Sequence, residues 1–292
     1  MISRRCVVFG LAGLLAAGLM IGCGDPQAAT NFSDMRVVNA LVGAPNGSAV
    51  DVDISHGYQP VTNLPFGGVS SFQNGRLGEA DFTVRSANTQ NVLVPANTVT
   101  LQTGKAQTVA IAGVVGGQGA LAPRLFRFLE DTIPANFVPA QTGTAQPDNI
   151  TFAVRVYNLS PDSGPINLEP SALGLTNVSY GSASDYIIVT APADRGPDPN
   201  DPAKMISLGR ATIDFAFRET ATGNLIPRTG AALFVVVPGN VVNVFAVGLR
   251  NPGPGQQGFT VEVVPITNPI PQTTTTTQTG ARSQPRELHL TR

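Results

Sequence analysis

Side chains that could carry out acid–base catalysis are scarce in this chain of 292 residues. His56 is one of only two histidines, and its context, Ser-His-Gly-Tyr, is typical of the tip of a hairpin. A Ser–His–Asp triad would need this imidazole as its general base, but no Gly-x-Ser-x-Gly elbow supplies a nucleophile. We therefore expect His56 to be an exposed turn residue, and we identify no catalytic residue.

Two aspartates, Asp51 and Asp53, lie two residues apart on a segment with the alternation of a β-strand, so both carboxylates point to one face. Paired carboxylates could serve glycoside hydrolysis or bind calcium. The same pattern is explained by a half-buried strand whose Val50, Val52 and Ile54 face the core. This structural interpretation accounts for all five residues and is favoured.

Three further acids, Asp194, Asp198 and Asp201, are the best metal candidates and lie on a proline-rich insertion, 193–203. Carboxylate oxygens are ligands that Ca²⁺ prefers, but the spacing is not that of an EF-hand loop. The prolines favour a solvated surface loop instead. With two cysteines and two histidines in the whole chain, a Cys/His zinc site or a c-type haem site lacks its ligands. No metal or cofactor is therefore expected.

Arginines recur at matching places in the two halves of the chain: Arg36 corresponds to Arg155, and Arg85 corresponds to Arg218. A recurring arginine could bind an anionic ligand through two parallel hydrogen bonds. More often such an arginine closes a salt bridge or covers the rim of a sandwich with its aliphatic stem. The structural role is favoured for all of them.

Aromatic residues recur in the same way, because Phe66 and Phe72 in the first half match Tyr180 and Tyr186 in the second. Rings on a strand–turn–strand could form a platform on which a sugar stacks, and Phe72 and Tyr186 are the candidate residues for such carbohydrate binding. Rings at these positions more often pack in the core or at its rim, and that interpretation is favoured.

The N-terminus has the pattern of a secretory signal. Arg4 and Arg5 precede an uncharged apolar run, 6–21, of 16 residues, which is shorter than the ~20 residues of a membrane span. The run ends in Met-Ile-Gly-Cys23, which resembles a bacterial lipobox with a cysteine that receives lipid. An uncleaved anchor helix and ordinary secretion with an incidental cysteine are the alternatives.

Segments without a core are expected at both ends. We predict a lipoprotein signal peptide over 1–22 and a tether over 23–33. Gly24 instead of Asp after the lipidated cysteine favours export to the outer membrane of a Gram-negative cell. The Thr/Pro-rich segment 267–292 has too few apolar residues to build a core and is predicted to be disordered.

The rest of the chain has the composition of an all-β protein, with 31 glycines and 24 prolines. Apolar and polar residues alternate in short segments that turn residues separate, at the spacing of sandwich strands. The predicted strands are 35–41, 49–54, 81–85, 97–101, 107–112, 151–158, 184–190, 211–218, 231–237, 241–247 and 258–264.

The two halves of this central part are similar to each other. The segment 62–72 aligns with 176–186, with Thr, Asn, Gly, Ser and both aromatic positions retained. We therefore predict two tandem antiparallel β-sandwiches, over 34–130 and 150–266. The segment between them, 131–149, is rich in Pro, Thr, Gln and Ala and is predicted to be a linker.

A family resemblance rests on three stretches, 36–40, 49–53 and 155–162, with the sequences Arg-Val-Val-Asn-Ala, Ala-Val-Asp-Val-Asp and Arg-Val-Tyr-Asn-Leu-Ser-Pro-Asp. These stretches are similar to the opening of the domain-of-unknown-function family numbered 4397. The second half departs from the pattern at 166–168, where Ile-Asn-Leu replaces Val-Asp-Val. The resemblance implies an extracytoplasmic β-sandwich module, immunoglobulin-like or transthyretin-like, often repeated and often on bacterial lipoproteins. It implies no known activity.

Charge narrows the function classes further. The formal net charge is −1 and 13% of residues are charged, which disfavours a strongly basic nucleic-acid-binding protein. We expect a non-enzymatic envelope lipoprotein, held at the outer membrane or cell surface by its lipid, that displays two sandwiches for a structural, binding or adhesive role. Its partner is expected to be an envelope protein or a glycan. A carbohydrate-binding module protein is the alternative, and an enzyme is the least favoured class.

Overall fold

The computed structural model confirms the all-β class. Apart from the short 3-10 turn η2 (Gly119–Leu121), every element assigned in the described residues is a β-strand. No described helix is long and apolar enough to cross a membrane. The residues that the structure describes are 32–43, 49–76, 78–130, 133, 137, 147–170, 173–230, 233–266 and 286–287.

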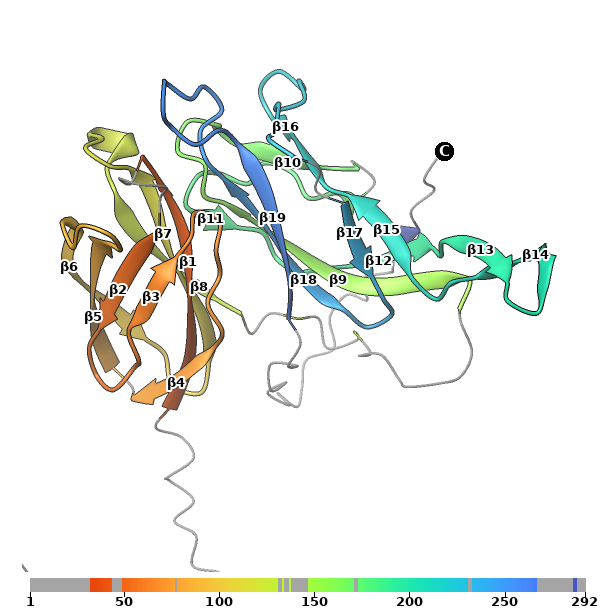
Figure 1. Cartoon of the computed structure of the whole chain (residues 1–292), viewed down its shortest axis with the longest axis horizontal. Coiled ribbons are helices and arrows are strands. Elements are labelled where there is room, and N and C mark those ends of the chain that lie inside the picture. Colours follow the sequence, from red (N-terminus) through yellow and green to blue (C-terminus); the bar gives the residue numbers. More distant parts are fainter. Residues whose placement is uncertain are drawn as a thin grey trace, which may run out of the picture.

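The first sandwich is built from two four-stranded sheets, with the strand orders β4-β1-β7-β8 and β3-β2-β5-β6 (Figure 1). Buried apolar residues from both sheets form one core between them. The strands are β1 (Phe32–Val42), β2 (Val50–Ile54), β3 (Val61–Leu64), β4 (Gln73–Arg76), β5 (Gly78–Ser86), β6 (Val92–Leu101), β7 (Ala106–Val114) and β8 (Arg124–Leu129).

The second sandwich has the same plan with more irregular edges. One layer has the order β19-β18-β9-β12-β20, with β11 also paired to β9, and the facing layer consists of the pairs β10-β16 and β15-β17. Its strands are β9 (Asn149–Asn158), β10 (Ile166–Glu169), β11 (Ser182–Ala183), β12 (Ile187–Pro192), β15 (Ala211–Asp214), β16 (Ala216–Glu219), β17 (Leu233–Val236), β18 (Val241–Val247), β19 (Thr260–Ile266) and β20 (Arg286–Glu287).

The predicted antiparallel arrangement is wrong for one central strand pair in each sandwich, and in the second sandwich the short edge pair β12–β20 is parallel as well. Strand β1 runs parallel to β7, and β9 runs parallel to β18. Parallel neighbours need a long connection, and here all the intervening strands of the sandwich supply it. The first strand of each half can therefore lie beside a late one, so that both sandwiches place corresponding residues on the same sheet.

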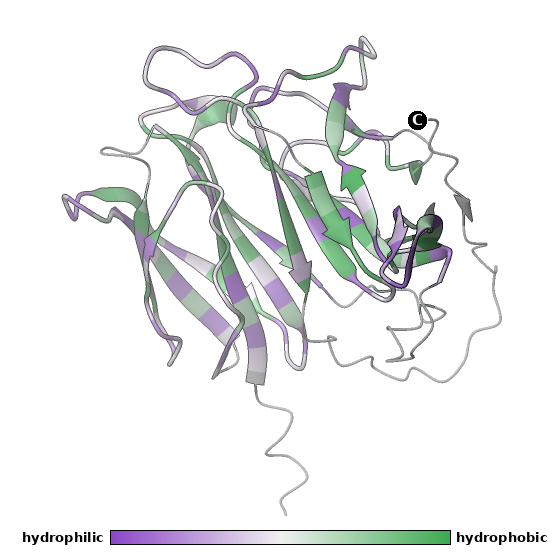
Figure 2. Ribbon diagram, turned by 45° about the vertical axis from the view of Figure 1, so that its right-hand side comes forward, coloured by the Kyte–Doolittle hydropathy of each residue, from purple (hydrophilic) through white to green (hydrophobic). Residues whose placement is uncertain are grey.

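The two sandwiches stack face to face, so that four layers follow one another (Figures 1 and 2). Strands β7 and β18 are buried along their whole lengths, because each has its own core on one face and the other sandwich on the opposite face. An apolar cluster fills the space between the inner sheets, and it contains Val38, Ala40, Ala110, Ala112, Phe128, Tyr157, Leu159, Phe245 and Val247.

The same backbone contacts recur in both halves. The Val37 N–H donates to Ser70 Oγ at 2.9 Å, and the Val156 N–H donates to Ser184 Oγ at 3.0 Å. Each serine thus fixes the segment that follows the aromatic–glycine turn against the first strand of its own sandwich. This shared contact explains why a serine stands at the same place in both aligned segments.

A second shared contact involves the aligned asparagines, Asn63 and Asn177. Both adopt left-handed backbone conformations, with φ of 52° and 59°, which asparagine tolerates better than most residues. Their N–H groups donate to side chains on the neighbouring strand, Asp51 at 2.7 Å and Asn167 at 2.8 Å. The Thr-Asn repeat is therefore a turn with the same geometry in both sandwiches.

The structure corrects two of the segments predicted within the second sandwich. The insertion 193–203 is no loop: β13 (Arg195–Asp198) and β14 (Asp201–Ser207) form a hairpin that projects away from the first sandwich (Figure 1). Prolines are compatible with this hairpin because each of its two strands has an unpaired edge. The predicted strand 211–218 is split into β15 and β16 at Phe215, whose carbonyl accepts a hydrogen bond from Arg228 instead of a neighbouring strand.

The predicted end segments lie mostly outside the described residues. These include the signal peptide 1–22 and Cys23. At the edges of these segments the structure differs from the prediction. Phe32 and Ser33, which were assigned to the tether, belong to β1. Strand β20 lies in the tail that was predicted to be disordered, and it pairs with β12 of the second sandwich. In the predicted linker, Phe137 is buried in an apolar cluster with residues of both sandwiches.

Candidate functional site between the two sandwiches

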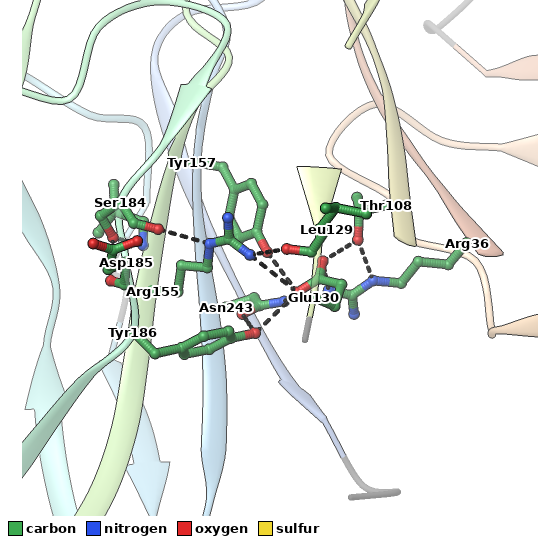
Figure 3. A network of polar contacts seen from close by, with 11 residues as sticks. Arg36, Thr108, Leu129, Glu130, Arg155, Tyr157, Ser184, Asp185, Tyr186 and Asn243 are labelled. Carbon is green, nitrogen blue, oxygen red and sulfur yellow. Dashed lines mark hydrogen bonds and ion pairs between the residues drawn. The ribbon is translucent and has the colours of Figure 1, made fainter. Parts of the chain in front are cut away.

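A fully buried carboxylate, that of Glu130, lies between the two inner sheets (Figure 3). Glu130 directly follows β8 of the first sandwich, and polar side chains of both sandwiches converge on it. Its Oε1 accepts from Arg36 Nη2 at 3.1 Å and from the Thr108 hydroxyl. Around Oε2 lie Tyr157 Oη at 2.7 Å, Tyr186 Oη at 2.9 Å, Asn243 Nδ2 at 3.2 Å and Arg155 Nη1 at 3.8 Å.

Corresponding strand positions supply these groups from each side. Arg36 on β1 is the register partner of Thr108 on β7, and Arg155 on β9 is the register partner of Asn243 on β18. Because the side chains of one strand alternate between its faces, both pairs point out of their own cores and toward the other sandwich. The parallel strand pairing described above is therefore what positions the site.

Electrostatics keeps Glu130 ionised although it is buried. Burial alone would raise its pKa, but Arg36, Arg155 and the hydroxyls of Thr108 and Tyr157 hold the pKa of this carboxyl below its usual range. Each oxygen already accepts several hydrogen bonds. A carboxylate in this state is a poor general base, because the proton it would take is opposed by the two guanidinium groups.

The two tyrosines of the site are neutral hydrogen-bond donors. Burial, together with the nearby charge of Glu130, raises the pKa of both Tyr157 and Tyr186 well above the usual value. The Tyr186 hydroxyl also lies 2.7 Å from Asn243 Oδ1, so its single proton is shared between this amide oxygen and the carboxylate. Neither phenol is poised to act as an acid near neutral pH.

The guanidinium group of Arg155 also donates hydrogen bonds to backbone carbonyls. Its Nε donates to the Ser184 carbonyl at 2.7 Å, and its Nη1 donates to the Leu129 carbonyl. Burial lowers the pKa of Arg155, but the acidic groups around it, Tyr157, Glu130, Tyr186 and Asp185, outweigh this effect and raise the pKa. Both guanidinium groups also lie over aromatic rings, Arg36 at 4.8 Å from the centre of Phe72.

The arrangement of these groups stabilises the contact between the two sandwiches. A buried ion pair costs desolvation, and it is stable only if its remaining donors and acceptors are satisfied. Here the acceptor Glu130 is saturated, and its partners belong to both sandwiches. Separating the sandwiches would expose Arg155 and leave Glu130 with only the contacts from its own side.

The recurring arginines form ion pairs, in agreement with the structural interpretation. Arg36 and Arg155 pair with Glu130 as described. At the surface, Arg85 pairs with Asp53 at 2.9 Å, and the corresponding pair of the second sandwich joins Arg218 and Glu169 at 2.6 Å.

The candidate sugar-binding rings are brought together, but not as an exposed platform. Tyr186 is only 4% exposed, and its hydroxyl belongs to the buried network. Phe72 is partly buried, packs against the same apolar cluster and lies over the Arg36 guanidinium. The rings therefore pack at the rim of the interface, which is the role that the sequence favoured for them.

The residues considered for catalysis lie elsewhere. His56 is in a turn with φ of 64°, and its Nδ1 is 2.6 Å from Ser55 Oγ. Asp51 accepts hydrogen bonds from the Asn63 N–H and from the Gln90 amide, both at 2.7 Å. The pair formed by Asp51 and Asp53 is thus engaged in contacts on the outer face of the first sandwich, Asp53 with Arg85.

The three candidate metal ligands do not converge. Asp194 accepts from the Thr212 hydroxyl at 2.7 Å, while Asp198 and Asp201 each accept from a backbone N–H two residues further along the chain. In the part of the chain that the structure describes, no group of three or more His, Cys, Asp or Glu side chains is placed to hold a metal ion.

Sequence reasoning missed the central residue, Glu130, and its partner Asn243. The signal is clear for Asn243, a polar residue that interrupts the apolar run Val241–Val247, and weaker for Glu130, which follows the alternating strand Arg124–Leu129. Buried polar groups are paired, so each of these residues predicts a partner even where the partner cannot be named.

The fold and the site define an all-β protein of two stacked sandwiches joined through a buried ion cluster. Residues 33–136 match the model of a family described as a domain of unknown function, DUF4397. No curated protein matches the chain.

Similar solved structures include the family CBM26 module CBMbc of Eubacterium rectale Amy13K in complex with maltoheptaose, at 10% identity over 81% of this chain and 99% of that chain, with a TM-score of 0.20. A leucine-rich repeat protein from Bacteroides thetaiotaomicron VPI-5482 is 11% identical over 74% of this chain and 26% of that chain, with a TM-score of 0.18. These scores are too low to assign a common fold or ligand.

Proposed function

We propose that this chain is a non-enzymatic bacterial envelope lipoprotein that displays its two β-sandwiches as a single unit. The observation that carries the proposal is the buried cluster around Glu130, which draws groups from both sandwiches. Such a cluster suits a display protein, because it keeps the surface loops of both sandwiches in fixed relative positions toward a partner.

The proposed anchor is a lipid on Cys23, after removal of residues 1–22. Residues 24–31 precede the first strand, and a chain of this length reaches at most ~3.3–3.6 Å per residue, or about 30 Å in total. The first sandwich would therefore stay near the membrane surface, in an extracytoplasmic location at the outer membrane or cell surface. Acyl chains on one cysteine provide stable attachment when there are two or more of them.

We further propose that the second sandwich is another copy of the domain that matches in the first. Matched contacts support this proposal, since Ser70 and Ser184 each bind the first strand, and Asn63 and Asn177 form the same turn. The insertion that forms β13 and β14 and the changed residues at 166–168 account for the divergence of the second copy.

The use of the charged groups supports a role without catalysis. In the buried cluster Glu130 pairs with both Arg36 and Arg155, and His56 and the Asp51–Asp53 pair lie outside this cluster. An envelope protein or a glycan is the proposed partner. Turnover of an envelope polysaccharide by the purified protein, lost on Asp51→Asn or Asp53→Asn, would overturn this part of the proposal.

The anchor is tested by metabolic labelling with a radioactive fatty acid in a bacterial host. The wild-type chain and a Cys6→Ser variant should both incorporate label and fractionate with membranes, whereas Cys23→Ser should lose the label. Globomycin, which blocks the lipoprotein signal peptidase, should cause the precursor to accumulate. Label retained by Cys23→Ser, or no effect of globomycin, would contradict the lipoprotein proposal.

The partner is sought by cross-linking in intact cells followed by purification of the tagged protein. The matched control is Cys23→Ser, which contains both sandwiches but lacks the proposed anchor. A partner captured by the wild type and lost from this variant would support display at the membrane.

A further inference from the structure

A cavity of about 370 Å³ opens beside Arg36 at the edge of the interface. Its walls come from both sandwiches, from the segment before β4 on one side and from the end of β19 on the other. The lining residues are Arg36, Val69, Ser70, Ser71, Phe72, Val264, Pro265 and Ile266. Arg36 is the only charged residue among them, so the cavity has a single cation at its wall.

The guanidinium of Arg36 has donors to spare. Arginine carries five N–H donors, and those of Arg36 bind Thr108 through Nε and Glu130 through Nη2. Within the described residues Nη1 has no acceptor, yet it is not a fully enclosed unsatisfied atom, since only Ser86 Oγ and Tyr180 Oη fall in that class. The unused side of Arg36 is therefore in contact with the cavity.

The matching arginine of the second sandwich, Arg155, has an acidic residue nearby. Beside Arg155 stands Asp185, and its negative charge is one of the groups that raise the pKa of Arg155 (Figure 3). The aligned residue next to Arg36 is Ser71, because Ser70-Ser71-Phe72 matches Ser184-Asp185-Tyr186. The first sandwich thus retains the arginine and the aromatic ring but has no carboxylate at this place.

The charge balance of the site points the same way. The cluster contains two guanidinium groups and one buried carboxylate, Glu130, with both tyrosines neutral. On the Arg155 side, the exposed residue Asp185 supplies a negative charge that offsets the excess positive charge. On the Arg36 side, the excess positive charge faces the cavity instead.

We propose that the cavity beside Arg36 binds the carboxylate of a small ligand, which takes the place that Asp185 occupies beside Arg155. Arg36 would donate through Nη1, and the Ser71 hydroxyl would add a second donor, whereas the Ser70 hydroxyl already donates to the Ser71 carbonyl at 3.0 Å. The Phe72 ring, which already lies over the guanidinium, would pack against the ligand's apolar part. A cavity of this size admits a molecule between acetate and a hexuronic acid.

The test is isothermal titration calorimetry of the full chain in detergent at constant ionic strength. The probes are sodium acetate and sodium D-glucuronate, with acetamide and D-glucose as neutral counterparts. Saturable binding of either carboxylate, with no binding of its neutral counterpart, is expected. Equal responses to the charged and neutral members of each pair, or no response to either carboxylate, would overturn the proposal.

Two variants of one residue locate the binding. Ser71→Asp places a carboxylate where Asp185 stands in the second sandwich, so it should lower carboxylate affinity by about tenfold or more and raise the urea midpoint of the protein without ligand. Ser71→Asn has the size of the Ser71→Asp side chain without its charge and exchanges the hydroxyl donor for an amide donor, so it should lower carboxylate affinity clearly less than Ser71→Asp does. Carboxylate affinity unchanged in Ser71→Asp would place the binding elsewhere and refute the site.

A variant of the other sandwich provides an independent check. Asp185→Ser recreates the first sandwich's arrangement beside Arg155 and removes the carboxylate that offsets its charge. Added acetate should then restore part of the lost thermal stability of this variant, and acetamide should not. Equal effects of acetate and acetamide on Asp185→Ser would contradict the proposed equivalence of the two sides.

Discussion

The two inner sheets have the same strand plan but opposite side-chain sizes where they meet. In the first sandwich, Val38 and Ala110 are register partners, and in the second the corresponding partners are Tyr157 and Phe245. The two rings stack with their centres 4.5 Å apart. Small residues on one sheet thus leave the room that large residues on the other fill. Duplicated domains become a specific pair when their equivalent positions diverge in this complementary manner.

The charged residues at equivalent positions of the two inner faces also differ in a complementary way. The backbone N–H of Glu130 bonds to the carbonyl of Ala106, and at the equivalent place of the second sandwich Ile266 is the register partner of Val241. Only the first sandwich therefore supplies an acid at this strand position, although both supply an arginine. Two identical faces would bring together either four charges or two unpaired guanidinium groups, whereas one acid serves both arginines.

The largest expected effect is loss of that single acid. Glu130→Gln keeps the shape but leaves two buried guanidinium groups without a carboxylate, and breaking a buried pair in this way costs about 3–5 kcal/mol of unfolding free energy. Urea denaturation followed by circular dichroism measures the change. The matched control is Asp53→Asn, which breaks the exposed pair with Arg85 and should cost about 0–1 kcal/mol. Equal losses in the two variants would show that the cluster does not hold the sandwiches together.

Acid should remove the same contribution from the wild type. The pKa of Glu130 is lower in the folded protein than in the unfolded chain, so its stabilisation is complete above the unfolded pKa of about 4.3. It is lost as the pH falls below that value and through the folded pKa. Urea midpoints measured between pH 7 and pH 3 should therefore fall more steeply for the wild type than for Glu130→Gln. Parallel curves would contradict the assignment.

The strands of this interface show how far the sequence alone could lead. Alternation of apolar and polar residues predicted most strands, and the fully buried, largely apolar segments Ala106–Val114 and Val241–Val247 were also predicted as strands, over 107–112 and 241–247. The sequence pattern cannot show which part of the protein covers the second face of a strand that is buried on both faces. The stacking of the sandwiches, and with it the partner of Asn243, depends on contacts between residues far apart in the chain.

The candidate site was predictable only in part, for the same reason. The recurrence of Arg36 and Arg155 indicated equivalent positions and favoured ion pairs, and both form them. Their shared partner was not found, because Glu130 has no counterpart in the second half and a repeat comparison reveals only what the two halves retain. Residues that make the halves differ, such as Ser71 against Asp185, become informative only when the faces are seen together.

The complementary sizes of the inner faces are tested by making them alike. Ala110→Phe gives the first sheet the residue that Phe245 provides on the second. Ala110 is fully buried in the interface cluster, and overpacking of this kind costs about 1–3 kcal/mol, with the upper end expected for a whole ring. Ala203→Phe on the exposed strand β14 is the control and should change stability by less than about 0.5 kcal/mol. Equal effects would mean that the faces are loosely packed.

The two aromatic–glycine turns make reciprocal contacts across the interface. A Cβ on Gly181 would collide with the Phe126 ring of the first sandwich, and a Cβ on Gly67 would lie 2.7 Å from Glu262 Oε1 of the second. Both glycines have positive φ, 73° and 76°. Phe126 is fixed by an edge contact with Tyr180, 5.2 Å between ring centres, whereas the Glu262 side chain is half-buried and flexible.

Three glycine-to-alanine variants separate the cost of backbone strain from the cost of the collision across the interface. Gly104 also has a positive φ but no atom within 4 Å of an added Cβ, so Gly104→Ala reports the strain alone, about 1–2 kcal/mol. Gly67→Ala should cost slightly more because Glu262 can move aside, and Gly181→Ala should cost about 1–3 kcal/mol beyond the strain because the Phe126 ring cannot. Urea unfolding of the three variants measures these differences. Equal losses in all three would mean that the sandwiches separate readily in solution, since only a maintained interface makes Phe126 an obstacle.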